Sequence, residues 1–315
     1  MNNDYLEKIQ FNDTDLVKIS ETVSCKDTEI IPKVKDAGNI YFDDNLNKFI
    51  QIMHNGLKIF TDSHYGKINV EIIRQLKGHH EPQEELVFYE ILKKIPSKAT
   101  MIELGSFWAY YSMWFNSQIN EAKNYMVEPM FFEEGIKNFK INNLKGTKFI
   151  QGCVGSEYID NLEFKQIDDR DTESLDGKGK IIETTVKIPQ VSLDSLIMDN
   201  RIEYADIVHC DIQGHETEML NGAKNSLLEK KIGYFFISTH SPIIHLQIID
   251  KLKSYGYKII NEFSPRESYT SDGCVTACHP NLFEINIKVT KKTSFSLLIK
   301  SKIDYLKYLF TKKNT

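Results

Sequence analysis

No apolar run in the 315 residues reaches the roughly 20 residues that a transmembrane helix needs. The first five residues, Met1-Asn-Asn-Asp-Tyr5, are polar and acidic, so they lack the basic and then apolar pattern of a secretory leader. The net charge of −5 is small and gives no reason to expect nucleic acid as a partner. We therefore expect a globular protein that is large enough to bury a substantial core.

Cysteine is also scarce: the chain has five, an odd number, and they are scattered. A chain of this length does not need disulfides for stability, so we expect reduced thiols and a cytoplasmic protein. Cys274-x-x-x-Cys278 is not accompanied by a second pair, which argues against a zinc site.

A glycine-rich pyrophosphate loop is missing as well. The apolar run in 100–104 predicts a buried strand, Gly105 predicts a tight turn, and a helix is expected to follow. The residues from Ser106 to Tyr110 contain no glycine, so the G-x-G-x-x-G pattern of nicotinamide-binding proteins is absent. A strand followed by one glycine turn favours a nucleoside without a pyrophosphate group.

A second predicted strand, 124–128, ends in a carboxylate. Glu128 can accept hydrogen bonds from both hydroxyls of a ribose, and it follows Gly105 closely enough to share one pocket. A third strand, 148–153, ends in small residues that could flank an adenine. These features predict an S-adenosylmethionine site, and the residues expected to form it are Glu103, Gly105, Ser106, Tyr111, Glu128, Cys153 and Val154.

Strands and helices alternate through the rest of the chain, which predicts an α/β fold with a doubly wound, mostly parallel sheet. We expect an N-terminal cap or subdomain at 1–77, a cofactor-binding domain at 78–287 and a separate tail at 288–315. The further predicted strands are 205–211, 234–240, 258–263 and a final pair at 274–278 and 282–287. The predicted helices are 82–95, 130–142 and 243–255.

Two other segments have weaker patterns. Within the cap, 40–42, 49–53 and 57–60 could be short strands, with Asn55-Gly56 as a hairpin turn. The polar segment 156–185 is expected to be a loop or hairpin on the rim.

The segment Gly78-His-His-Glu-Pro82 precedes a predicted helix that begins at Pro82. His79, His80 and Glu81 then lie near the mouth of the pocket. We consider two alternatives, substrate contact and a loop whose histidines only form hydrogen bonds.

Several motifs together resemble the FkbM-type methyltransferase family. They are Glu103-Leu-Gly-Ser-Phe-Trp-Ala-Tyr-Tyr-Ser112, Val127-Glu-Pro129, Val191-Ser-Leu-Asp-Ser-Leu196 and Asp206-Ile-Val-His-Cys-Asp-Ile-Gln-Gly-His-Glu216. The resemblance covers about 78–287. It implies a class I methyltransferase-like seven-stranded sheet and S-adenosylmethionine-dependent O-methylation, often of sugar hydroxyls. A sugar or glycan acceptor, in a surface polysaccharide or its precursor, is therefore expected.

The resemblance has departures. The family commonly has Asn and Gly where this chain has Phe107 and Ala109. Phe107 is bulky enough to block a pocket, so a catalytically silent binding protein stays open as an alternative. A nicotinamide-dependent oxidoreductase is the other, although its pyrophosphate loop is missing.

A sugar hydroxyl needs a base or a metal ion before it can accept a methyl group near neutral pH. In one arrangement, His240 or His215 is the general base and Asp211 orients it. In the other, Asp211 with Glu216 or His240 holds Mg²⁺ or Mn²⁺, which binds the hydroxyl oxygen.

The tail contains eight Lys and one acid, Asp304, so its net charge is +7 and that of the remaining chain is −5 − 7 = −12. Apolar residues recur between the lysines, which predicts a basic amphipathic helix. Three environments suit it: an anionic membrane on the cytoplasmic side, a protein partner, or the surface of its own domain.

Overall fold

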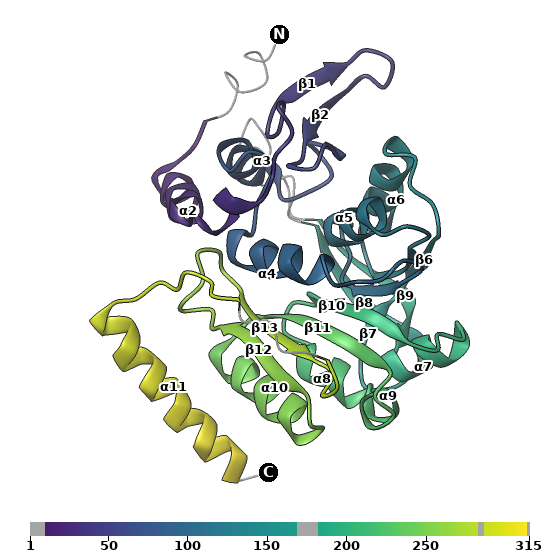
Figure 1. Cartoon of the computed structure of the whole chain (residues 1–315), viewed down its shortest axis with the longest axis vertical. Coiled ribbons are helices and arrows are strands. Elements are labelled where there is room, and N and C mark those ends of the chain that lie inside the picture. The colour runs from purple at the N-terminus through teal and green to yellow at the C-terminus, as the bar shows by residue number, and fades with distance from the viewer. Residues whose placement is uncertain (1–9, 169–181, 283–286, 314–315) are drawn as a thin grey trace.

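The computed structural model describes residues 10–168, 182–282 and 287–313. Figure 1 shows a central sheet with helices on both faces, a small cap at the N-terminal side and a long helix at the C-terminal end. The elements are α2 (Asp13–Ser24), η1 (Asp27–Ile30), β1 (Ile40–Asp43), β2 (Lys48–Ile52), β3 (Lys58–Phe60), α3 (Gly66–Gln75), α4 (Pro82–Leu92), β4 (Thr100–Leu104), α5 (Tyr110–Gln118), β5 (Lys123–Glu128), α6 (Phe132–Ile141), β6 (Thr147–Gln151), β7 (Cys153–Val154), β8 (Ile159–Asp168), β9 (Ile182–Val191), α7 (Leu193–Asp199), β10 (Ala205–Cys210), α8 (Glu216–Asn221), α9 (Lys224–Leu228), β11 (Ile232–Thr239), α10 (Pro242–Ser254), β12 (Lys258–Phe263), β13 (Gly273–Cys278) and α11 (Phe295–Lys313).

The central sheet has seven strands in the order β12-β13-β11-β10-β4-β5-β6. β13 is antiparallel to both of its neighbours, and the other strands run parallel to one another. The strand order reverses between β4 and β10, and the carboxyl ends of the strands at that point form the usual ligand site of an open α/β sheet. The predicted doubly wound, mostly parallel seven-stranded fold is confirmed.

Both faces of the sheet are buried, which explains why its strands are almost continuously apolar. Met101 and Phe236 pack against the cap-side helices α4 and α5. Ile102 and Phe235, one residue away in the same strands, pack against the helices on the opposite face. Successive side chains alternate between the two cores, as strand geometry requires.

The predictions differ from the structure at two places along the sheet. The expected strand 148–153 is divided, because β6 ends at Gln151 and β7 leaves the central sheet to pair with β9. The expected strand 282–287 falls largely on residues 283–286, which lie outside the described residues.

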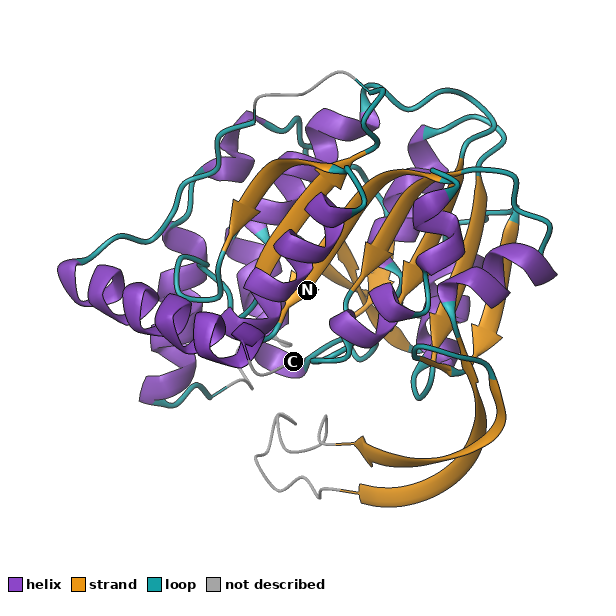
Figure 2. Ribbon diagram, turned by 90° about the horizontal axis from the view of Figure 1, so that it is seen from below, coloured by secondary structure: helices purple, strands orange, loops and turns teal. Residues whose placement is uncertain are grey.

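The predicted rim segment 156–185 is a hairpin in its described part. β8 and β9 pair antiparallel, and residues 169–181 between them lie outside the described residues. Figure 2 shows these two strands as a ribbon that extends away from the body of the protein.

The cap consists of an antiparallel β1-β2-β3 sheet with α2 and α3 beside it. The three short strands and the Asn55-Gly56 turn were predicted, and the two helices were not. The amide of Lys58 donates to the side chain of Asn142, directly after α6, at 2.8 Å, and the amide of Phe60 donates to Asn138 of α6 at 3.2 Å. These bonds attach the cap to the domain that carries the site.

All five cysteines are buried free thiols, as expected from their number and spacing. Within the described ranges, none of the helices has the length and apolarity to cross a membrane.

Candidate functional site

Gly105 forms the turn at the end of β4 for a reason of packing. Its φ is +76°, and a Cβ atom at this position would lie 1.7 Å from the backbone oxygen of Asp211. The amide of Asp211 in turn donates to the oxygen of Leu104 at 2.8 Å. The glycine therefore brings the ends of β4 and β10 together, and the space above it is occupied by the chain following β10.

Phe107 and Ala109, where the sequence differs from the family pattern, both have a left-handed backbone conformation. Their φ values are +41° and +64°, in the left-handed region that Gly and Asn enter most easily. This geometry gives a physical reason for Asn and Gly at the two positions in the family that the sequence resembles. The Phe107 ring packs against Tyr65 and Phe131, with ring centroids 4.7 and 5.2 Å apart.

Glu128, at the end of β5, is a buried carboxylate that already accepts three backbone hydrogen bonds. Phe107 donates to one oxygen at 3.0 Å, and Met130 and Phe131 donate to the other at 3.0 and 3.1 Å. Burial raises the pKa of Glu128, and these bonds partly oppose the rise. A carboxylate accepts about four hydrogen bonds, so one position stays available for a ribose hydroxyl.

Three of the other expected cofactor residues, Cys153, Val154 and Ser106, lie at the ends of the strands. Gly152 donates to the backbone oxygen of Glu128 at 3.2 Å, which places Cys153 and Val154 next to the end of β5. Ser106 follows the Gly105 turn, and its hydroxyl is buried without a hydrogen-bond partner in the described chain. A buried orphan hydroxyl at this turn is a suitable contact for a polar ligand.

The side chains of Glu103 and Tyr111, the remaining expected cofactor residues, do not lie at the strand ends. Glu103 lies inside β4, where it accepts a bond from the amide of Ser112 at 3.2 Å, and burial raises its pKa to about 7. The Tyr111 hydroxyl donates to Glu81 at 2.8 Å. Both side chains lie in the buried layer beneath the strand ends.

His240 is at the centre of the second group of predicted residues. Its Nδ1 lies 2.7 Å from Glu216, and its Nε2 lies 3.2 Å from Asp211 and 3.6 Å from Asp272. Asp211 follows β10 and His240 follows β11, so the neighbouring parallel strands bring them together. His215 is exposed at the start of α8, and within the described residues no ion pair joins it to this group.

The surrounding acids determine the charge of His240. Burial alone would lower its pKa, but the interactions of the ring with the Asp211 and Glu216 carboxylates raise the pKa of His240 to about 10. Burial raises the pKa of Asp272 to about 6, with His240 opposing the rise. His240 therefore carries a proton at neutral pH. This charge argues against the expectation that His240 is the general base, and it leaves the carboxylates as proton acceptors.

Glu81 connects the predicted substrate residues to this group. It is 3.2 Å from the Nε2 of His80, and it lines one small hollow together with Asp272 and Glu84. Burial alone would lower the pKa of His80, but Glu81 and Glu85 raise it to about 10. Glu81, at the wall of the hollow, is suitably placed to contact a substrate.

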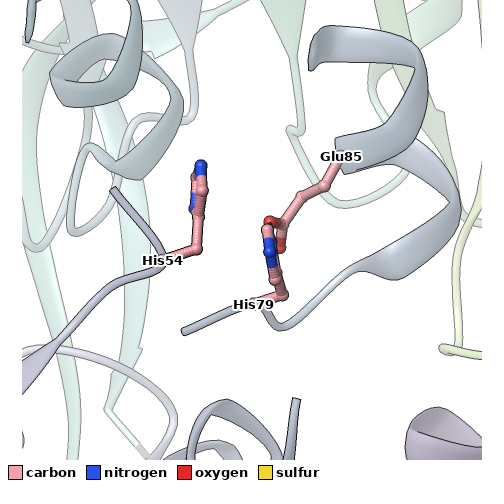
Figure 3. A group of neighbouring side chains, drawn as sticks. All are labelled: His54, His79 and Glu85. Atoms are coloured by element: carbon pink, nitrogen blue, oxygen red, sulfur yellow. The ribbon is translucent and has the colours of Figure 1, made fainter. Parts of the chain in front are cut away.

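His79 has a different environment, because its side chain is fully buried. Its ring stacks on that of His54 from the cap, with centroids 4.2 Å apart and planes at 16°, and its Nδ1 pairs with Glu85. Figure 3 shows the two rings side by side next to the Glu85 carboxylate. The loop alternative fits His79 better than substrate contact.

His54, His79 and Glu85 also lie close enough to hold a metal ion by distance alone. A metal bound to imidazole lies in the plane of the ring, about 2 Å from the nitrogen. Two stacked, nearly parallel rings have no common point in both planes near their nitrogens. Tyr110 instead links the group by donating to Glu85 at 2.9 Å and lying 3.0 Å from His54. We interpret the group as a hydrogen-bond network.

Two residues of the site were not predicted. Asp272 lies in the segment before β13, and Tyr65 comes from the cap, immediately before α3. Partial burial raises the pKa of Tyr65, and the charges of Asp211, Glu128, Glu81 and Asp272 raise it further, while its ring packs against Phe107. Both residues are distant in sequence from the motifs, and no local pattern identifies them.

We expect the free energy of unfolding to fall as the pH rises from about 6.5 to about 10. His80 and His240 have folded pKa values of about 10, above the usual histidine value of 6.5. Their contribution is complete below the unfolded pKa and is lost as the pH approaches the folded pKa. Urea unfolding at a series of pH values would measure this slope, and His240→Asn should reduce it. An unchanged slope in His240→Asn would contradict the charge assigned to His240.

The family follows from the sequence profile described as Methyltransferase FkbM domain, which matches residues 93–259, more than half of the chain. The chain belongs to the FkbM methyltransferase family. This match includes β4, Glu128, Asp211 and His240, and it begins after His79 and Glu81. No curated protein matches the chain significantly.

Solved structures with a similar overall arrangement include methyltransferases. M. capricolum TrmK in complex with S-adenosyl-homocysteine is 16% identical, covers 73% of this chain and 86% of its own, and has a TM-score of 0.39. Precorrin-6y C5,15-methyltransferase from Geobacter metallireducens is 11% identical, with coverages of 61% and 86% and a TM-score of 0.39. A human methyltransferase 10 domain containing protein is 13% identical, with coverages of 64% and 83% and a TM-score of 0.40.

Membership in this family supports S-adenosylmethionine-dependent methylation.

Proposed function

We propose that the protein is an S-adenosylmethionine-dependent O-methyltransferase that acts on a sugar hydroxyl. The observation that carries this proposal is the arrangement at the carboxyl edge of the sheet. Glu128 and the Ser106 turn lie at β5 and β4, and Asp211, His240 and Asp272 gather at β10 and β11. A nucleoside site next to a group of proton acceptors suits methyl transfer to a hydroxyl.

The charge of the edge supports a cationic donor. The charges of Asp211, Glu128, Glu81 and Asp272 all act on Tyr65; His240 lies beside Asp211 and Asp272, and His80 lies beside Glu81. S-adenosylmethionine carries a sulfonium ion, and transfer of its methyl group leaves a neutral thioether. The excess of carboxylates therefore favours the charged donor over its neutral product.

The sugar acceptor is supported by polar groups at the wall of the site. Glu81 and Asp272 line one small hollow of about 10 Å³ with Glu84 and Thr270, and their carboxylate oxygens can accept hydrogen bonds from hydroxyl groups. The resemblance to the FkbM-type family favours the same class of acceptor. A surface glycan or its precursor is the acceptor we propose.

Deprotonation of the acceptor falls to a carboxylate in this proposal. As the acceptor oxygen forms its bond to the methyl carbon, its proton passes to Asp211 or Asp272. Asp272 has a pKa of about 6, which suits a general base near neutral pH. His240 stays protonated, held by Glu216, and stabilises the negative charge that develops on the oxygen.

A divalent cation is the alternative for this position, and the residues fit it. The Nε2 of His240 is buried, and neither Asp211 nor Asp272 is aligned to accept a hydrogen bond from it. Glu216 holds Nδ1, as an outer carboxylate holds a metal-binding histidine. Two carboxylates and one imidazole suit Mn²⁺ better than Mg²⁺. Such an ion would lower the proton affinity of a bound hydroxyl.

Binding of S-adenosylhomocysteine tests the cofactor assignment. We expect micromolar affinity by calorimetric titration and at least an approximately tenfold loss in Glu128→Ala, because the remaining acceptor position of the carboxylate disappears. Glu133→Ala removes an exposed acid a few residues away and should bind normally. NADH serves as the ligand control. Failure of the wild-type protein to bind the homocysteine would contradict the proposal, and binding of NADH in its place would favour an oxidoreductase.

Glu128 also fixes the backbone of Phe107, Met130 and Phe131, so the variant needs a folding control. Circular dichroism and the urea midpoint should be measured on the same samples. Acceptors can then be screened with methyl-labelled S-adenosylmethionine and a panel of sugars, with and without EDTA. Loss of transfer in EDTA that Mn²⁺ restores would support the cation; transfer unaffected by EDTA would support the carboxylate base.

A further inference from the structure

α11 is fixed to the body of the protein by its polar residues. Asp304 and Tyr308, one turn apart, are the buried positions of its described part. Asp304 pairs with Arg266, and Tyr308 donates to Asp250 of α10. Figure 1 shows α11 lying alongside α10 at the outside of the molecule. Packing on its own domain was one of the three expected environments, and α11 contacts the body through this line of polar residues.

The apolar residues of α11 face the opposite way. At about 100° per residue, Ile299, Leu306 and Phe310 point roughly 160–200° away from Tyr308. Leu306 is 55% exposed and Phe310 is 71% exposed. The neighbouring positions on the same arc are also exposed and apolar, and they are Leu298, Ile303 and Leu309. An apolar arc along a whole helix that points away from its own domain is larger than scattered surface apolar residues require.

Lysines lie within and beside this arc. Lys302, Lys300 and Lys307 are exposed, and the helical geometry places the first inside the arc and the other two at one edge. Residues 288–315 carry a net charge of +7, whereas the rest of the chain carries −12. A second copy of the chain would bring a negative body toward the arc, but it would also bring another cationic helix if the two arcs met. An anionic surface complements the lysines along the entire helix.

We propose that α11 binds the surface of an anionic lipid bilayer. The helix lies parallel to the membrane plane, with its apolar arc in the region between headgroups and acyl chains and its lysines at the phosphates. The Asp304 and Tyr308 contacts hold the body on the other side of the helix, so the enzyme binds in a fixed orientation. This inference does not depend on the identity of the methyl acceptor.

Vesicle flotation of the full-length protein tests the proposal. We expect it to float with vesicles of phosphatidylcholine mixed with phosphatidylglycerol, to float poorly with phosphatidylcholine alone, and to dissociate at high salt. The double variants Lys302→Glu/Lys307→Glu and Leu306→Ser/Phe310→Ser should each weaken binding by about tenfold or more. Lys94→Glu/Lys224→Glu reverses two exposed lysines elsewhere and should bind as the wild type does.

Three outcomes would overturn the proposal. The first is failure of the wild-type protein to float with anionic vesicles. The second is equal loss of binding in the Lys94/Lys224 control, which would show a general charge effect. The third is a dimer in gel filtration that Leu306→Ser/Phe310→Ser dissociates without any effect on flotation, which would assign the arc to a second copy. The urea midpoints of all variants should match, because the altered side chains face away from the body.

Discussion

Glu85→Ala should lower the free energy of unfolding by about 3–5 kcal/mol, a large fraction of the stability of a typical domain. Glu85 is fully buried, and it accepts from the amides of His80 and Glu81 at 2.7 and 3.0 Å and from the Tyr110 hydroxyl at 2.9 Å. Burial alone would raise its pKa, but His79 and His80 hold the pKa of Glu85 well below its usual range. Its removal leaves these buried donors without an acceptor.

Equilibrium urea unfolding measures this effect. Glu90→Ala, on the same helix, removes a carboxylate that pairs with Lys93 at the surface, and its cost should be about 0–1 kcal/mol. Glu85→Gln keeps an oxygen acceptor and should lie between the two. Equal midpoints for Glu85→Ala and Glu90→Ala would contradict the network assigned to Glu85. A larger loss in Glu85→Ala than in Glu85→Gln would identify the missing acceptor as the cause.

Local sequence patterns predicted most of the helices and strands that position the site. Pro82 identified the start of α4, and the apolar runs identified β4, β10 and β11, because these signals arise within a few neighbouring residues. The carboxyl ends of neighbouring parallel strands must meet, so Asp211 and His240 could be placed together. The cap helices α2 and α3 were missed, although Ile68, Ile72 and Leu76 of the α3 segment recur at helical spacing and share one small core with Ile19 of α2.

The remaining site residues depend on distant contacts. Asp272 reaches His240 from the segment before β13, and Tyr65 reaches the same acids from the cap. The charge of His240 was also beyond prediction, because it depends on Asp211, Glu216 and Asp272 together. Gly105 was predicted to allow a ligand to approach. In the structure, a Cβ atom at position 105 would lie 1.7 Å from the backbone oxygen of Asp211, so packing alone requires glycine there.

Asp211→Asn should lower the rate of methyl transfer by about 10²–10⁴-fold while S-adenosylhomocysteine still binds. In the proposed mechanism Asp211 either accepts the proton of the acceptor hydroxyl or helps to hold a cation, and the amide can do neither well. The substitution keeps the backbone oxygen that packs against Gly105, so the turn should be preserved. Asp199→Asn, at an exposed position at the end of α7, should have wild-type activity. Normal activity in Asp211→Asn would exclude Asp211 from the reaction.

The pH profile then separates Asp211 from Asp272. If Asp272 is the base, the rate of the wild-type enzyme should fall as the pH drops through about 6, and Asp272→Asn should abolish that limb. Asp211→Asn would retain the limb, because Asp272, the proton acceptor in this case, is still present. A limb that stays near pH 6 in Asp272→Asn would exclude Asp272 as the base. With Asp272 as the base, His240→Asn should lower the rate and shift the acid limb to higher pH, because the positive charge of His240 lowers the pKa of Asp272.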